Sequence, residues 1–124
     1  MTDEQYQELL QLVRDRAGDA FRAAIAYDES DWSVLYIRED VATPDLRDAL
    51  DPLTERTRIR DPVVTPDLYD EIGETQAAVE LHEKAALIHF RETSDHGVVV
   101  SLDREIAQGL GNFVNRCKGV LSGD

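Results

Sequence analysis

The chain has 124 residues, 42% of them hydrophobic, which is enough for one domain with its own core and too few for two. Its 26 acidic and 13 basic residues give a formal net charge of −13, which disfavours a general nucleic-acid binder and docking on an anionic membrane. No apolar run approaches the ~20 residues of a membrane span, and the polar, acidic N-terminus is not typical of a signal peptide, so we expect a cytoplasmic protein.

The first part of the chain predicts a helix followed by a β-hairpin. Thr2 and Gln5 have the spacing of a capping box, and apolar residues follow at helical spacing, so we expect a helix over residues 3–17. Two β-rich runs, residues 21–27 and 32–38, are separated by a polar tetrapeptide, which is typical of a hairpin. Both faces of these strands carry apolar residues, so we expect both sides of the sheet to be covered.

A second helix starts at Thr43, a capping residue followed by proline at the first helical position, and we expect it to fade near Arg56. Residues 57–64 have a mixed pattern, and we expect an irregular stretch, with a strand or a segment ordered by a partner as the alternatives. The Thr-Pro-Asp-Leu tetrapeptide that opens the second helix returns at residues 65–68, where it predicts a short helix ending at Ile72.

A second hairpin is predicted around a turn at Glu83 and Lys84. With that turn, one face of the hairpin is entirely apolar, and its pairs are Leu81 with Ala86, Val79 with Ile88 and Ala77 with Phe90. The other face is mixed, and its pairs are His82 with Ala85, Glu80 with Leu87 and Ala78 with His89. Cross-strand partners share a face, so the apolar face supports this register, although Glu-Lys is not a favoured turn pair.

The last part of the chain predicts a turn at residues 93–97, a fifth strand at residues 98–102 and a final helix that Asp103 caps. The apolar stripe of this helix is expected to face the core, and it consists of Ile106, Leu110, Phe113, Val114, Cys117 and Leu121. Cys117 is the only cysteine, so no intrachain disulfide can form, and its place in the stripe predicts a buried structural thiol.

These elements predict one α+β domain over residues 1–124, with a five-stranded, mainly antiparallel sheet and flanking helices in the order α-β-β-α-(α)-β-β-β-α. The order resembles that of the roadblock/LC7 family over nearly the whole chain, and more loosely the longin, profilin and GAF-like folds. No diagnostic motif accompanies this likeness, which is one of element order.

The charged residues are unusual in kind as well as in number. Of the 26 acidic residues 15 are Asp, and of the 13 basic residues 11 are Arg, so lysine is nearly absent. Concentrated salt would screen the self-repulsion of such a chain. The composition resembles that of small acidic proteins of salt-in halophilic archaea, a likeness that implies no activity. The alternative is an ordinary acidic protein that is poor in lysine.

No residue pattern indicates a catalytic, metal or cofactor site, so an enzyme is disfavoured and no cofactor is expected. Glu80, His82 and His89 share one face of the second hairpin, and a zinc site would need all three to converge on one point. The two histidines lie about two cross-strand pairs apart, so we expect ordinary surface or interface histidines.

Arg56, Arg58 and Arg60 form the only basic cluster, and they would share one face if this stretch were extended. Such a cluster can bind a phosphate or an acidic patch of a partner. The alternative is that these arginines pair with nearby acids such as Glu55 and Asp61.

We therefore expect a non-enzymatic protein-interaction or regulatory module that forms a homodimer and docks a further protein partner. The roadblock/LC7 resemblance implies pairing through the face that bears the second helix, with Leu35 and Ile37 as candidates. Trp32, at the start of a strand, is a further interface candidate, and Leu87 and His89 provide a fallback surface. The alternative function is a GAF- or PAS-like small-molecule sensor, which needs a cavity of roughly 300 Å³ or more between sheet and helix.

Overall fold

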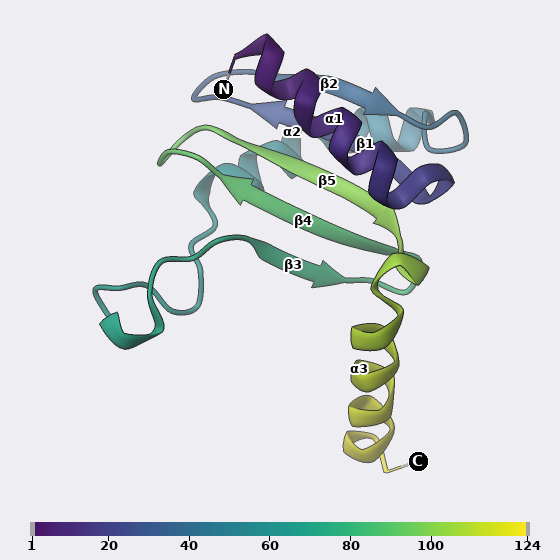
Figure 1. Cartoon of the computed structure of the whole chain (residues 1–124), viewed down its shortest axis with the longest axis vertical. Helices are drawn as coiled ribbons and strands as arrows, with labels where there is room; N and C mark the ends of the chain where they lie inside the picture. Colours follow the sequence, from purple (N-terminus) through teal and green to yellow (C-terminus); the bar gives the residue numbers. More distant parts are fainter. Residues whose placement is uncertain (1, 124) are drawn as a thin grey trace.

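The computed structural model describes residues 2–123, and a five-stranded antiparallel sheet lies at its centre (Figure 1). The strands are β1 (Phe21–Tyr27), β2 (Trp32–Ile37), β3 (Ala78–Leu81), β4 (Ala85–Arg91) and β5 (Gly97–Asp103), in the spatial order β2-β1-β5-β4-β3. The helices are α1 (Asp3–Ala17), α2 (Pro44–Ile59) and α3 (Gln108–Leu121), with short 3-10 turns at Gly18–Ala20, Asp70–Ile72 and Arg104–Ala107. The predicted α+β class and element order are confirmed. None of these helices is long and apolar enough to cross a membrane.

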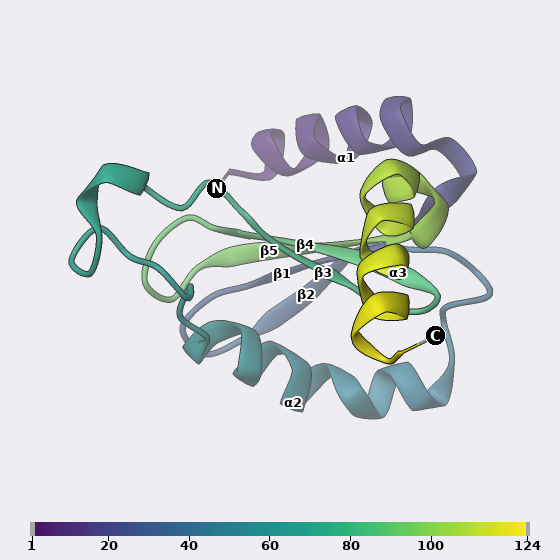
Figure 2. The ribbon, with the colours of Figure 1, turned by 90° about the horizontal axis from the view of Figure 1, so that it is seen from below.

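Helices α1 and α2 lie on opposite faces of the sheet, so the molecule has three layers (Figure 2). The capping box that opens α1 is present, because Thr2 Oγ1 accepts a hydrogen bond from Gln5 N at 3.1 Å and Gln5 Oε1 accepts one from Thr2 N at 2.8 Å. The main core lies under α1 and consists of Leu10, Phe21, Ala24, Ala26, Val98, Val100 and Leu102. The central strands β1 and β5 therefore supply nearly all of it.

The register predicted for the β3–β4 hairpin is confirmed. Glu80 pairs with Leu87, and the backbone N–H of His82 donates to Ala85 O at 2.8 Å to close the turn. The apolar face of the hairpin is only partly covered, because β3 is an edge strand and the side chain of Val79 is exposed. The adjoining Ala77 lies just outside the strand.

Helix α2 is longer than predicted, so the irregular stretch expected over residues 57–64 begins only at Arg60. The helix continues through Arg56 to Ile59, although Pro52 lies within it. Thr54 is buried and its hydroxyl donates to Leu50 O at 2.9 Å, which keeps this polar side chain satisfied under the helix. The chain loses regular structure only from Arg60 onward.

The segment that follows α2, residues 61–77, is called the acidic loop here, because it contains five Asp and Glu residues and no Lys or Arg. The second Thr-Pro-Asp-Leu tetrapeptide forms one hydrogen-bonded turn, in which the N–H groups of Leu68 and Tyr69 donate to Thr65 O. The predicted helix to Ile72 is therefore reduced to this turn and the 3-10 turn Asp70–Ile72.

The prediction that α3 packs its apolar stripe into the core is wrong. Helix α3 leaves the body past the β3 edge of the sheet (Figure 1), and Gly111 is its one buried residue. Cys117, predicted to be buried, is exposed, as are the stripe residues Leu110, Phe113 and Leu121 and the neighbouring Val120. The reason is topological: α3 follows the central strand β5, and α1 and α2 already flank the middle of the sheet (Figure 2).

Arg104 fastens the base of α3 to the body. Its guanidinium donates to His82 O at 2.7 Å and to Asn115 Oδ1 at 3.0 Å. We expected Asp103 to cap the final helix, but its side chain makes no capping hydrogen bond. Its carboxylate instead accepts two hydrogen bonds from Arg38, at 2.8 and 3.1 Å, which ties β5 to the chain after β2.

Candidate functional site

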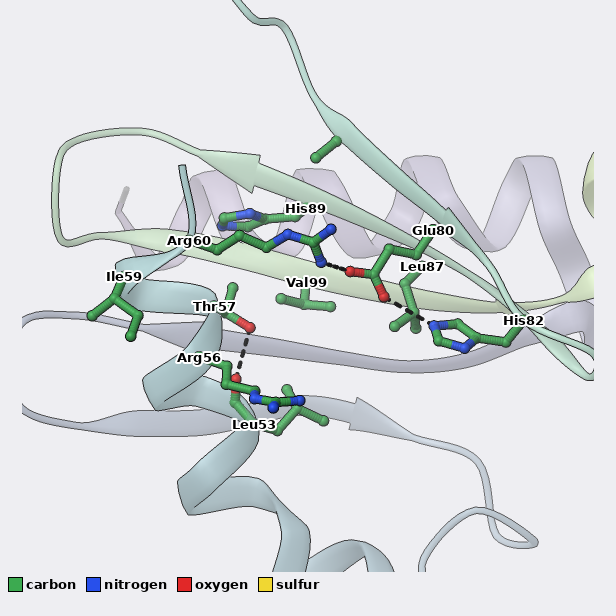
Figure 3. A pocket seen from close by; sticks show the side chains of 11 residues that line it. Leu53, Arg56, Thr57, Ile59, Arg60, Glu80, His82, Leu87, His89 and Val99 are labelled. Atoms are coloured by element: carbon green, nitrogen blue, oxygen red, sulfur yellow. Dashed lines mark hydrogen bonds and ion pairs between the residues drawn. The ribbon is translucent and has the colours of Figure 1, made fainter. Parts of the chain in front are cut away.

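A cavity of about 690 Å³ lies between the C-terminal half of α2 and the β3–β4 part of the sheet (Figure 3). Its lining is Leu53, Arg56, Thr57, Ile59 and Arg60 from α2 and the residue after it, together with Ala78, Glu80, His82, Leu87, His89 and Val99. The cavity exists because α2 leaves the face of β3 and β4 uncovered on its side. Leu87 and His89, predicted as a possible interface, line this opening.

The basic cluster is divided by the helix. In a helix, residues four apart share a face, so Arg56 and Arg60 both reach the cavity, and Arg58 points elsewhere. Arg58 donates to Asp28 O at 2.8 Å and pairs with Glu55 at 2.5 Å. The three arginines would share one face only in an extended chain, and they do not share one here because this stretch is helical to Ile59.

Of the charged side chains that line the cavity, one cation has no ionic partner among residues 2–123. Arg60 forms an ion pair with Glu80, whose other carboxylate oxygen lies 2.9 Å from His82 Nε2 (Figure 3). Arg56 has no ion pair or hydrogen bond of its side chain to any of residues 2–123. The cavity therefore combines apolar walls with one unpaired guanidinium at its rim.

The predicted group Glu80, His82 and His89 lines the same cavity but does not converge on one point. His89 Nε2 lies 2.6 Å from the Tyr27 hydroxyl, and His82 instead contacts Glu80. Among residues 2–123 no group of three or more His, Cys, Asp or Glu side chains is placed to hold a metal ion.

His89 is held neutral by its surroundings. Burial lowers the pKa of His89 below the ordinary histidine value, and the nearby cations Arg91 and Arg60 lower it further. Burial also raises the pKa of the Tyr27 phenol that contacts it. At neutral pH the pair is an uncharged hydrogen bond on the sheet wall of the cavity.

The cavity lacks the parts of a nucleophilic site among the described residues. Its one hydroxyl, Thr57 Oγ1, donates to Leu53 O at 2.8 Å, so its hydrogen bond is made within α2. The two histidines are engaged by Tyr27 and Glu80, and neither contacts that hydroxyl. The described residues of the cavity therefore include no activated nucleophile.

The remaining interface candidates from the sequence are not brought together. Leu35 packs against the core under α1. Ile37 is partly buried opposite Ala23, and Trp32 donates its indole N–H to Asp51 of α2. These three side chains help to hold β2 in place, and they lie on the edge of the sheet opposite β3.

Sequence reasoning missed the α2 part of the cavity. Leu53, Arg56 and Arg60 follow one another at spacings of three and four, which is the signal for one helical face. This spacing would have predicted a common face if the predicted helix had continued beyond Arg56. The sheet wall from Val99 carried no signal, because its pairing with His89 depends on strand order.

A second feature is the pair of segments that project past β3. Helix α3 and the acidic loop both extend beyond this edge, at opposite ends of the strand (Figure 1). Both expose large apolar side chains, which are Leu110, Phe113, Val120 and Leu121 in α3 and Val63, Leu68, Tyr69 and Ile72 in the loop. Their charges are opposite, because α3 contains Arg116 and Lys118 and no acidic residue.

The family to which the chain belongs follows from a match over nearly its whole length. A family model described as a domain of unknown function (DUF7522) matches residues 7–122. The chain belongs to the DUF7522 family. The match runs from α1 to the end of α3, so the projecting helix is part of the DUF7522 domain. No curated protein matches the chain.

Proposed function

We propose that this DUF7522 domain is a non-enzymatic protein-interaction module that pairs with a second copy of itself along β3. The observation that carries the proposal is the placement of α3 and the acidic loop at opposite ends of the same sheet edge (Figure 1). A two-fold axis through that edge sets α3 of each copy beside the acidic loop of the other. Such an isologous interface uses one surface twice and closes on itself.

The connections of β3 support this geometry. The acidic loop leads into the first residue of β3, and α3 is fastened near the other end through the bond from Arg104 to His82 O. Two copies of β3 that run antiparallel about the axis therefore bring unlike segments together. An edge strand also presents unpaired backbone N–H and C=O groups, which a second strand can satisfy.

Charge complementarity supports a second copy as the occupant. The acidic loop carries five acidic residues and no Lys or Arg, and α3 carries two basic residues and no acid. In a chain of net charge −13, α3 is the helix with a positive charge, and the loop of a second copy is a fitting negative surface.

The apolar surface is of the size that a stable dimer needs. Fully burying a side chain such as Leu or Phe removes roughly 100 Å² from water. The eight large apolar side chains of α3 and the acidic loop are 51–94% exposed, so they supply roughly 560 Å² per copy, and two copies together clear the roughly 1,000 Å² that a biological interface needs. Pairing would also cover an apolar surface that a monomer leaves open to solvent.

The setting we propose is a salt-rich cytoplasm, and the role is that of a scaffold or regulator that docks a further protein. Support for the setting is the composition, in which Arg replaces Lys and Asp exceeds Glu. In such a medium the charge of the body is screened, so apolar pairing meets less electrostatic repulsion.

The test is the molar mass in solution, measured by light scattering after size exclusion in concentrated KCl. We expect twice the chain mass of 14.0 kDa, with a monomer appearing on dilution. Cys117 gives a second readout because it is the only cysteine and is exposed on the α3 stripe. Its reaction rate with a thiol reagent should fall as protein concentration rises. A monomer at all concentrations with a constant thiol rate would overturn the proposal.

A matched pair of variants locates the interface. Leu110→Glu places a charge on the α3 stripe, and Leu12→Glu makes the same change at an exposed position of α1. We expect the first variant to be monomeric and the second to pair like the unaltered protein. Equal effects of the two changes would show that α3 is not the pairing surface.

A further inference from the structure

We infer that the cavity between α2 and the β3–β4 hairpin binds a small organic monoanion, namely an aliphatic or aromatic chain that ends in one carboxylate. This site is separate from the pairing proposed above and does not depend on it. The argument rests on the walls of the cavity, on one unpaired cation and on the Arg60–Glu80 ion pair that lines the same cavity.

The walls favour an apolar ligand body. Leu53 and Ile59 come from α2, and Leu87 and Val99 come from the facing strands (Figure 3). A volume of about 690 Å³ lies within the range of roughly 300–1,000 Å³ that is usual for small-molecule sites. Apolar walls of this extent make the burial of a hydrocarbon chain energetically favourable.

Arg56 is the group that would recognise the carboxylate. Its side chain has no partner among residues 2–123, and a guanidinium can bind a carboxylate with two parallel hydrogen bonds. The two other charged side chains of the cavity, Arg60 and Glu80, neutralise each other. The cavity thus carries one net positive charge, in a protein whose total is −13.

Glu80 limits the ligand to one negative charge. Its carboxylate lies on the β3 side of the cavity between Arg60 and His82 (Figure 3). Because Glu80 already pairs with Arg60, a second anionic group on the ligand would find no further unpaired cation at the cavity. A cationic ligand would instead be repelled by Arg56. The two residues together favour a monoanion over a dianion or an amine.

The test is isothermal titration calorimetry in concentrated KCl with three probes of equal chain length: octanoate, 1-octanol and octylammonium. We expect octanoate to bind one per chain, octanol to bind about tenfold more weakly and octylammonium not to bind. Equal binding of octanoate and octanol, or no binding of octanoate, would overturn the inference.

Two arginine variants assign the site. Arg56→Gln should weaken octanoate binding about tenfold and leave octanol binding unchanged, because only the carboxylate contact is lost. Arg47→Gln removes the same charge from an exposed position of the same helix and should change neither. Equal weakening by both variants would show that general charge, and not this site, attracts the anion.

The Leu110→Glu variant separates this inference from the pairing proposal. We expect octanoate to bind to it with the affinity of the unaltered protein, whether or not that protein is a dimer. Loss of binding in this variant would place the ligand at the interface between copies and overturn a site within one chain. An unchanged mass with intact binding would overturn the pairing proposal alone.

Discussion

Truncation of Phe113 provides a quantitative test of the proposed pairing. This ring lies on the α3 stripe and is 64% exposed in one copy. Burying a phenylalanine side chain completely contributes about 1.5–3 kcal/mol, so covering the open part contributes about 1–2 kcal/mol. A symmetric dimer loses this amount twice, and Phe113→Ala should therefore cost about 2–4 kcal/mol of association free energy. The dissociation constant should rise by roughly 30-fold to 1,000-fold.

The assay is analytical ultracentrifugation of a dilution series in concentrated KCl. The control is Leu12→Ala, which truncates a side chain that is 67% exposed on α1 and should leave the dissociation constant unchanged. Phe113→Ala should also leave the unfolding midpoint of the monomer nearly unchanged, since most of the ring contacts solvent. A dissociation constant for Phe113→Ala within about twofold of the unaltered protein would refute the reasoning, as would an equal effect of the control.

Three further predictions concern stability. Gly97→Ala should lower the free energy of unfolding by about 1–3 kcal/mol in urea, because an added Cβ would lie 2.6 Å from the Tyr27 hydroxyl and from a backbone oxygen of β4. Burial lowers the folded-state pKa of His89, so stability should fall as pH drops below the ordinary value of about 6.5, and NMR titration should show this ring protonating below that pH. Hydrogen bonds from Arg38 lower the pKa of Asp103, so its contribution is present above its ordinary pKa and is lost as pH falls through the lowered value. Asp103→Asn should therefore melt earlier at pH 7 and converge with the unaltered protein in strong acid.

The register of the second hairpin could be predicted from the sequence alone. Strand pairs share a face, so the apolar pairs around Glu83 and Lys84 were sufficient to predict the register of β3 and β4. Local capping chemistry likewise predicted the starts of α1 and α2. These features depend on residues that are close in sequence, where few alternatives compete.

The position of helix α3 relative to the sheet could not be predicted from the sequence. A stripe such as Leu110, Phe113 and Leu121 indicates that one face of the helix will be buried, but not whether the covering surface belongs to the same chain. The choice depends on which sheet faces are already occupied, and that follows from strand order. Cys117 was assigned to the core by the same step and is exposed for the same reason.

The arrangement of the arginine cluster depended on where helix α2 ends. Alternation of Arg56, Arg58 and Arg60 gives a common face only in extended chain, and α2 continues to Ile59 despite its internal proline. The helical extension turns Arg58 toward the first hairpin and leaves Arg56 at the cavity. A difference of three residues in a helix boundary therefore changed a predicted surface patch into one structural and two cavity-lining arginines.

Salt acts on the proposed pairing in two opposing ways, and their ranges decide the outcome. Two bodies of charge −13 repel each other over distances comparable to the Debye length, which is about 10 Å at 0.1 M salt and about 3 Å at 1 M. The attraction between α3 and the acidic loop acts across a contact, where the intervening salt is largely excluded. Raising KCl from 0.1 to 1 M should therefore remove more repulsion than attraction, while the apolar contribution is retained. We expect the dissociation constant to fall over this interval in a sedimentation series. A rise would show that charge pairing outweighs apolar contact at the β3 edge, contrary to the argument from exposed Leu and Phe side chains.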